Sequence, residues 1–163
     1  MVREKTKMEK MLISGVAADK NVAKIRVAGL GNDPESTFRL LNLLDRNNLN
    51  IDVMIQSLGK DGTKSVSFTV AKPDMLRTID VLNDNKDSLG IKKLDYDENV
   101  AKISVIGAGV RSHSGVAAKM FGALANAGIN TEMITTSEIR ITALIDEAYA
   151  DQAMRAIHET FLE

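Results

Sequence analysis

The chain has 163 residues, which is enough for one ordinary domain or two small ones. Its 21 basic and 22 acidic residues give a net charge of −1, which excludes the basic surface that nucleic acid or an anionic membrane would require. There is no cysteine, so disulfides, thiolate nucleophiles and cysteine metal sites are excluded. No apolar run approaches the ~20 residues of a membrane span, and MVREKTKMEK lacks an apolar signal core, so we expect a cytoplasmic protein.

A long internal repeat is the main feature of the sequence. Residues 19–31, DKNVAKIRVAGLG, and residues 97–109, DENVAKISVIGAG, agree at nine of thirteen positions with an offset of 78. Farther on, LNIDVMIQS at 49–57 aligns with INTEMITTS at 129–137, now with an offset of 80. A period of this length is typical of a duplicated small domain rather than a solenoid.

The first copy predicts six elements in the order βαββαβ, which is the ferredoxin-like pattern. Its helix start is marked by Asp33 as N-cap and Pro34 at the first helical position, and its hairpin turn by Asp61-Gly62. The expected elements are a strand over 23–28, a helix from Pro34 to Asn47, a strand over 51–55, a return strand over 66–70, a helix from Pro73 and a strand over 91–96.

The second copy begins in the same way but stops one strand short. The expected elements are strands over 102–106, 132–136 and 139–145, a helix starting at Ser112 or Ser114 and a helix over 150–161. The apolar segment Met11–Ala18 has no other role, so we expect it to cross over and supply the missing strand; the alternative is a disordered tail. The expected domains are a flexible tail over 1–10, one unit over 20–97, and a second unit joining 11–19 to 98–163.

Each first strand ends in Gly-x-Gly, at Gly29-Leu30-Gly31 and Gly107-Ala108-Gly109. A dinucleotide fingerprint would need a third glycine, which is Pro34 in one copy and Ser112 in the other. Two readings stay open: a simple strand-to-helix turn, or a turn whose N–H groups, with the helix behind them, favour a small carboxylate.

Two other kinds of site are disfavoured by the residue types. His113 has no nucleophile and acid that would make it a catalytic base, and capping is the simpler role for the serines beside it. RNA-binding domains of this topology stack bases on strand aromatics, and here only Phe68 is available. On the predicted strand that begins at residue 51, Asp52 and Gln56 fall on one face, where they are either solvated or in contact with a small ligand.

Four motifs are informative together: Gly107-Ala108-Gly109 leading into Ser112-His113 and Gly115-Val116, Thr136-Ser137-Glu138-Ile139-Arg140-Ile141, Asn50-Ile51-Asp52, and Ser14-Gly15-Val16-Ala17. With them, the sequence resembles the regulatory region of aspartate kinase over about residues 8–161. It implies an α+β fold of two ferredoxin-like ACT domains. The first would be inserted in the second, whose last strand comes from the N-terminal segment.

The resemblance also implies a function. Lysine and/or threonine would bind at ACT–ACT interfaces for feedback control, with no cofactor, and the chain would form a homodimer and act on a catalytic domain or subunit. The implied effector-binding residues are Asn32, Glu35, Ser36, Thr37, Asn50, Ile51, Asp52, Gln56, Arg111, Ser112, His113, Asn130, Thr131, Ser137 and Glu138.

The chain departs from the family pattern in two respects. The family's Asp-Lys-Pro-Gly loop is replaced by Asn32-Asp33-Pro34-Glu35, in which Asn32 stands for the family's acid and Glu35 for its glycine. The Lys-Phe-Gly-Gly-Thr-Ser segment of the kinase is absent, so we expect no catalysis by this chain alone, whether it is a separate subunit or a piece of a longer enzyme. The alternative function is a structural dimerisation module whose effector site has decayed.

Overall fold

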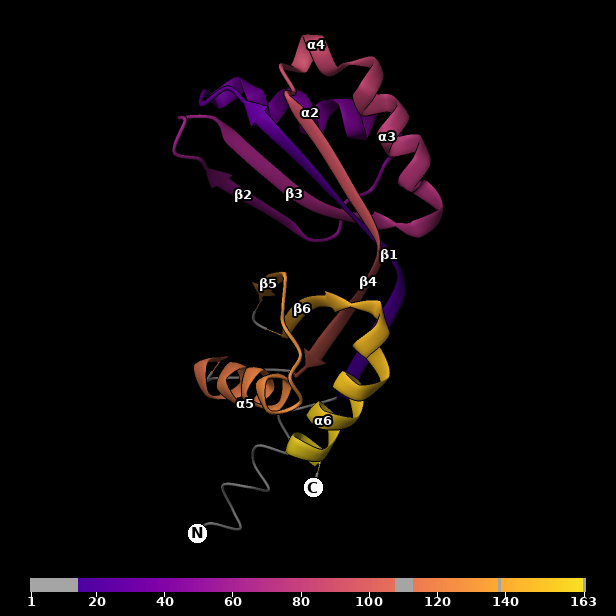
Figure 1. Cartoon of the computed structure of the whole chain (residues 1–163), viewed down its shortest axis with the longest axis vertical. Coiled ribbons are helices and arrows are strands. Elements are labelled where there is room, and N and C mark those ends of the chain that lie inside the picture. Colours follow the sequence, from indigo (N-terminus) through magenta and orange to yellow (C-terminus); the bar gives the residue numbers. More distant parts are fainter. Residues whose placement is uncertain (1–14, 108–112, 138, 163) are drawn as a thin grey trace. The chain divides into compact units, whose positions relative to one another are not determined.

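The computed structural model describes residues 15–107, 113–137 and 139–162. Its contacts divide the chain into two compact units. Asn21–Glu98 forms one, here called the first-repeat unit, and residues up to Lys20 join Asn99–Glu163 in the other, the second-repeat unit. Both units mix helices with antiparallel strands, so the expected α+β class is confirmed (Figure 1).

The first-repeat unit has strands in the order β2-β3-β1-β4. Val22–Leu30 of β1 pairs antiparallel with β3, and β2 pairs antiparallel with the other edge of β3. Its elements are part of β1 (Gly15–Leu30), α2 (Pro34–Arg46), β2 (Met54–Leu58), β3 (Lys64–Ala71), the 3-10 turn η1 (Lys72–Asp74), α3 (Met75–Asp84), α4 (Lys86–Leu89) and part of β4 (Lys93–Ile106).

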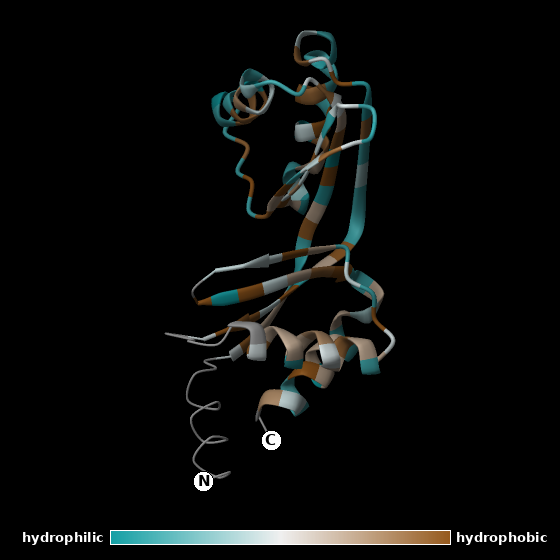
Figure 2. Ribbon diagram, turned by 90° about the vertical axis from the view of Figure 1, so that its left-hand side faces the viewer, coloured by the Kyte–Doolittle hydropathy of each residue, from teal (hydrophilic) through white to brown (hydrophobic). Residues whose placement is uncertain are grey.

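One face of this sheet carries the core. Ile25 of β1 pairs with Phe68 of β3, and both are fully buried against Leu40 and Leu44 of α2 and Leu82 of α3. Polar residues alternate with these along the strands, which is visible as alternating bands in Figure 2. The period of two therefore fixes which side of β2 faces α2: Met54, opposite Phe68, packs on the core, and Gln56 follows on the same side.

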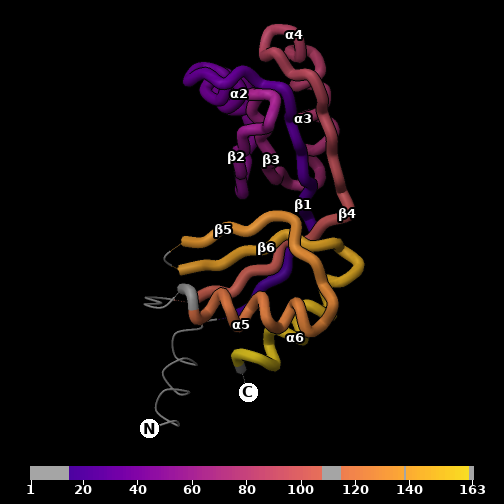
Figure 3. Tube along the Cα trace, turned by 60° about the vertical axis from the view of Figure 1, so that its left-hand side comes forward, coloured from indigo at the N-terminus to yellow at the C-terminus, as the bar shows by residue number. Residues whose placement is uncertain are grey.

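The second-repeat unit has strands in the order β1-β4-β6-β5, with α5 and α6 together on one face of them (Figure 3). Its core joins Ile103 of β4 and Ile141 of β6 to Met120 and Leu124 of α5 and Ile157 of α6. Its elements besides β1 and β4 are α5 (His113–Asn126), β5 (Met133–Thr136), β6 (Arg140–Asp146), the 3-10 turn η2 (Glu147–Tyr149) and α6 (Ala150–Leu162).

Two strands are longer than the sequence predicts. We expected separate strands before and after residues 19–22, but β1 runs unbroken through Gly15–Leu30, and β4 likewise joins the strands expected over 91–96 and 102–106. The polar segments at these points interrupt the apolar pattern without interrupting the extended backbone, because their side chains are mainly exposed. The expected tail over 1–10 and the segment 11–14 lie outside the described residues.

Smaller differences concern element ends. β2 begins at Met54 rather than at 51, because Asp52 and Val53 already bond to Thr69 without forming a regular ladder. The short helix α4 was not predicted; it is closed by Gly90, whose φ is 75°. Among the described residues, no helix is long and apolar enough to cross a membrane.

Candidate functional site

The N-terminus of α2 is capped by Asp33. Its Oδ1 accepts hydrogen bonds from the backbone N–H groups of Glu35 at 3.0 Å and Ser36 at 2.9 Å. Pro34, at the first helical position, has no N–H to offer. The cap predicted from Asp33-Pro34 is therefore confirmed, and it uses the donors of the first turn.

Two further contacts hold Asp33 in place. The buried Ser36 hydroxyl donates to Asp33 Oδ2 at 2.9 Å, and Lys64 Nζ from β3 donates to the Asp33 carbonyl at 3.0 Å. The Ser36 hydroxyl and then its backbone N–H lower the pKa of Asp33 below the ordinary value of 3.8. The carboxylate is thus ionised at neutral pH and lies where the helix dipole favours negative charge.

Beside this cap, α2 and β2 are joined by two of the expected effector residues. The Thr37 hydroxyl donates to Gln56 Oε1 at 2.6 Å. Thr37 lies in the first turn of α2, and Gln56 lies opposite Val66 in the ladder, so both stand on the helix side of the sheet. The sequence placed these two residues in one site, and the structure brings them into direct contact.

The remaining first-repeat candidates are spread around this pair. Asn32 and Glu35 are exposed, and Glu35 faces Arg39 across 3.7 Å. Asn50 and Asp52 are exposed in the segment before β2, whereas Ile51 between them is half-buried against the core. The backbone of Asp52 is fixed by its N–H, which donates to the Thr69 carbonyl at 3.1 Å.

The second-repeat candidates are only partly described. Asn130 and Thr131 precede β5 as Asn50 and Ile51 precede β2, and the Ser137 N–H closes the β5–β6 turn on the Arg140 carbonyl at 2.7 Å. His113 is the first residue of α5. Arg111, Ser112 and Glu138 lie outside the described residues.

The first Gly-x-Gly forms a turn that needs its glycines. Gly29 has a φ of 85°, and a Cβ there would lie 2.5 Å from the Lys92 side chain. At Gly31 a Cβ would meet Asp33 Oδ2 at 2.6 Å. Conformation and close packing therefore account for both glycines, as the turn reading expected.

Similarity to known proteins is found in a family model, in curated sequences and in solved structures. A family model described as an ACT domain matches residues 103–161. The aspartokinase of Pseudomonas aeruginosa is 37% identical over 158 residues, which are 97% of this chain and 38% of that protein. The aspartokinase of Helicobacter pylori is 40% identical over 156 residues, which are 95% of this chain and 38% of that protein.

Solved structures show a match over whole chains. A chain in a crystal structure of aspartokinase α and β subunits is 42% identical, with a TM-score of 0.86, covering 93% of this chain and 99% of that chain. The ligand-free regulatory subunit of aspartate kinase from Thermus thermophilus is 33% identical, with a TM-score of 0.86, covering 92% of this chain and 99% of that chain. This chain belongs to the aspartate kinase family.

Within aspartate kinase, the chain corresponds to the regulatory, non-catalytic ACT portion. It spans about 38% of the length of the curated relatives that it matches. The resemblance stated from the sequence motifs is therefore confirmed, as is the ferredoxin-like ACT fold.

Sequence reasoning did not place Asp33 and Lys64 among the site residues of this aspartate kinase regulatory chain. The sequence predicts Asp33 as a helix cap but does not place it beside the site. The available signal for that position was Asn-Asp-Pro-Glu in place of the family's usual loop. Lys64 follows the hairpin turn, and nothing in its sequence context connects it to residue 33, because that contact depends on the β1–β3 register.

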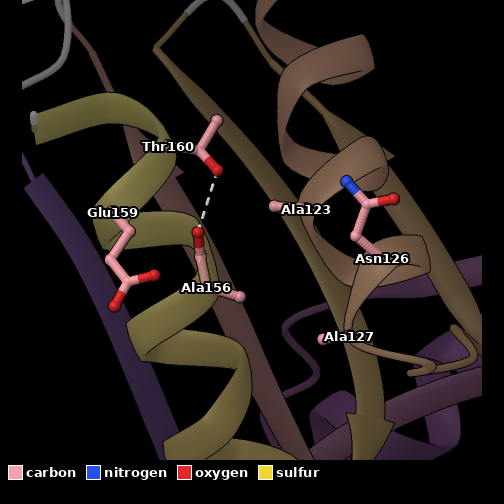
Figure 4. Close-up of a pocket in the computed structure, with 6 residues that line it drawn as sticks. All are labelled: Ala123, Asn126, Ala127, Ala156, Glu159 and Thr160. Carbon is pink, nitrogen blue, oxygen red and sulfur yellow. Dashed lines mark hydrogen bonds between the residues drawn. The ribbon is translucent and has the colours of Figure 1, made fainter.

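Away from these residues, the described part of the chain has at least two pockets. The larger, of about 480 Å³, is lined in the second-repeat unit by Ala123 and Asn126 of α5, by Ala127 just after it, and by Ala156, Glu159 and Thr160 of α6 (Figure 4). The Thr160 hydroxyl donates to the Ala156 carbonyl at 2.9 Å, and Asn126 and Glu159 give the lining a polar part beside the alanine methyl groups. The smaller, of about 230 Å³, lies beside the Arg26–Asp95 ion pair of 3.5 Å in the first-repeat unit. Among the described residues, no cluster of His, Asp or Glu could hold a metal ion.

Proposed function

We propose that this chain is a regulatory module of aspartate kinase that binds lysine and/or threonine at ACT–ACT interfaces for allosteric feedback control of aspartate-family amino-acid biosynthesis. The observation that carries the proposal is the Thr37–Gln56 hydrogen bond, which joins two of the expected effector residues. Its partners in the cell would be the catalytic domain or subunit of aspartate kinase and a second copy of this chain.

The direction of this hydrogen bond favours one kind of ligand atom. Because Gln56 Oε1 accepts the Thr37 proton, the exposed Gln56 amide still offers its two N–H donors. Lysine and threonine share the α-carboxylate and the α-ammonium group, so these donors distinguish them only at the side chain. They bind the hydroxyl of threonine and repel the side-chain ammonium group of lysine. At this point of the first-repeat unit, the chemistry supports threonine more than lysine.

Two exposed apolar side chains support a homodimer. Phe38 of α2 is 64% exposed and Leu58 of the edge strand β2 is 62% exposed. An edge strand also offers backbone hydrogen-bonding groups to another chain. A second copy that covers this edge would bury both side chains and place its own residues near Thr37 and Gln56.

Feedback control needs only that the effector prefer one quaternary state. A difference of about 3 kcal/mol in binding free energy between two states shifts their populations roughly 150-fold. No chemical step by this chain is required.

The experiment is titration calorimetry of the chain with threonine and with lysine, after sedimentation has established its oligomeric state. We expect saturable heat with at least one of them, and Gln56→Ala should weaken threonine binding. Ser57→Ala is the matched control, since Ser57 is exposed on the other face of the same strand. Absence of heat for both amino acids in a dimeric chain would contradict the proposal.

The second candidate function is a structural dimerisation module with a decayed effector site. It is favoured by the Asp33 cap, which already uses the first-turn donors of α2, and by Glu35 in place of glycine. It predicts a dimer whose melting temperature does not respond to ligand. A rise of several degrees with millimolar threonine or lysine would exclude it.

A further inference from the structure

The hairpin between β2 and β3 carries the sequence's single Asp-Gly pair, Asp61-Gly62, and Asn-Gly does not occur in the chain. Both residues are exposed, and a Cβ on Gly62 would have no heavy atom within 4 Å. Because glycine has no Cβ, its backbone nitrogen can approach the preceding side-chain carboxyl group with little steric hindrance. By residue type and exposure, the tip of this hairpin is therefore open to spontaneous isomerisation of aspartate.

The reaction needs only the chain and water. The Gly62 nitrogen attacks Asp61 Cγ, and its proton leaves together with the hydroxyl of the neutral carboxyl group as water, which closes a succinimide ring. Water then adds to either ring carbonyl. Opening at Cγ restores aspartate, whereas opening at the main-chain carbon gives isoaspartate, in which the backbone runs through the former side chain. Nothing is oxidised or reduced, and the water lost on closure is regained on opening.

Thr63 stabilises the Asp61 carboxylate against ring closure. Asp61 Oδ1 accepts a hydrogen bond from the Thr63 hydroxyl at 2.7 Å and another from the Thr63 N–H at 3.0 Å. These bonds, the hydroxyl first, lower the pKa of Asp61 below the ordinary value of 3.8, so the neutral carboxyl group that the reaction needs is scarce at neutral pH. Ring closure removes the negative charge that both bonds stabilise, so each of them favours the open aspartate.

The attacking nitrogen is also engaged in the turn. The Gly62 N–H donates to the Gly59 carbonyl at 3.1 Å, and the Gly59 N–H donates to the Thr63 carbonyl at 2.8 Å, which closes the turn around Asp61. The position of a Cβ on Gly59 lies 2.9 Å from Asp61 Oδ1, so the carboxylate packs closely against this residue. Since the nitrogen must lose its proton to form the ring, its hydrogen bond in the folded hairpin opposes the reaction.

We propose that Asp61-Gly62 is a latent isoaspartate site, and that Thr63 protects it by holding the Asp61 carboxylate while the β2–β3 hairpin is folded. An isoaspartyl bond would add a carbon atom to the main chain at the tip of the hairpin that sets Gln56 opposite Val66. The inference goes beyond the proposed function and does not depend on it, because the reaction involves no ligand and no partner chain.

The test measures isoaspartate at residue 61 in the full chain during incubation at neutral pH and physiological temperature. Labelling by isoaspartyl methyltransferase measures the modified groups, and mass spectrometry of the tryptic peptide 61–64 locates them and detects the succinimide, which is one water lighter. The folded unmodified chain should isomerise at a rate roughly tenfold or more below that of the same chain unfolded in urea. Thr63→Val keeps the branched shape and the N–H but lacks the hydroxyl, and it should isomerise about three- to tenfold faster than the folded unmodified chain.

Two further variants are the controls. Thr63→Ser retains the hydroxyl and should match the unmodified chain, and Lys60→Ala changes an exposed residue of the same turn and should also match it. Hydrogen exchange of the Gly59 and Gly62 amides shows whether the hairpin of each variant is still folded.

Several results would overturn the proposal. Equal rates in the folded and the unfolded chain would show that the turn does not protect Asp61, and absence of isoaspartate in both would show that the site is not reactive. An unchanged rate in Thr63→Val, or equal acceleration by Thr63→Val and Thr63→Ser, would show that the hydroxyl is not the protecting group. Acceleration accompanied by loss of amide protection would assign the effect to opening of the hairpin and would likewise exclude the hydroxyl.

Discussion

Thr37 and Gln56 are 19 residues apart in the sequence, and their side chains meet at 2.6 Å between the first turn of α2 and strand β2. This contact joins the helix to the edge of the sheet at the place where Phe38 and Leu58 leave apolar surface exposed. It is therefore the most informative position for mutation.

Replacing Gln56 by alanine should weaken threonine binding without unfolding the chain. Loss of the donors of Gln56 removes one or two hydrogen bonds to a ligand oxygen, which corresponds to about 1–1.5 kcal/mol and a roughly tenfold rise in Kd. Calorimetry gives the Kd, and chemical denaturation should show a change in unfolding free energy within about 0.5 kcal/mol, because the side chain is exposed. Equal binding by Gln56→Ala and Ser57→Ala would remove Gln56 from the site.

The stability conferred by Asp33 should depend on pH. Its pKa is lowered in the folded chain, chiefly by the Ser36 hydroxyl and then by the Ser36 N–H, so its ionised form stabilises the fold above the unfolded pKa near 3.8. That contribution is lost as the pH falls below 3.8 and through the lower folded pKa. The difference in unfolding free energy between the unmodified chain and Asp33→Asn should therefore be present at neutral pH and shrink in strong acid. A difference that grows on acidification would contradict the assignment.

Thr69 should be sensitive to loss of its hydroxyl. Its side chain is fully buried, and its Oγ1 accepts the Val53 N–H at 3.0 Å just before β2 begins. Thr69→Val keeps the shape but leaves that buried N–H without its acceptor, at a cost of about 1–3 kcal/mol in unfolding free energy. Thr69→Ser keeps the oxygen and should recover most of the loss; denaturant unfolding of both variants would decide, and equal losses would point to packing instead.

Two glycines should respond to alanine in opposite directions. Gly29→Ala introduces a Cβ at a φ of 85° against the Lys92 side chain and should destabilise by about 1–2 kcal/mol. Gly122 lies inside α5 with open space around it, so Gly122→Ala should stabilise by about 0.5–1 kcal/mol. Thermal unfolding of the two variants would show whether the melting temperatures move apart as expected.

The sequence predicted the elements where a local signal was strong. Asp33-Pro34 fixed the start of α2, and Asp61-Gly62 fixed the hairpin between β2 and β3, where Gly62 has a φ of 80°. The sequence did not show that β1 and β4 continue through their polar middle segments, because an exposed extended residue carries no apolar periodicity.

The candidate site was predictable to a similar extent. The resemblance to the family motifs predicted Thr37 and Gln56 as residues of one site. Which of their atoms meet depends on the β2–β3 register and on the side of the sheet that α2 covers. The contact of Lys64 with the Asp33 carbonyl was not predictable, because it depends on the β1–β3 register. The remaining positions, including Arg111 and Glu138, stay predictions.

Strands β1 and β4 are hydrogen-bonded neighbours, and each contributes residues to both units. In topological terms, residues 21–98 are a very long hairpin loop between two strands of the second-repeat unit. Replacing that loop by a short turn from Lys20 to Asn99 would leave all four strands of the remaining unit in the chain, whereas trimming the chain from its N-terminus to Asn21 would delete one of them. Excision from the middle therefore keeps every strand of the second-repeat unit, and truncation from the start does not.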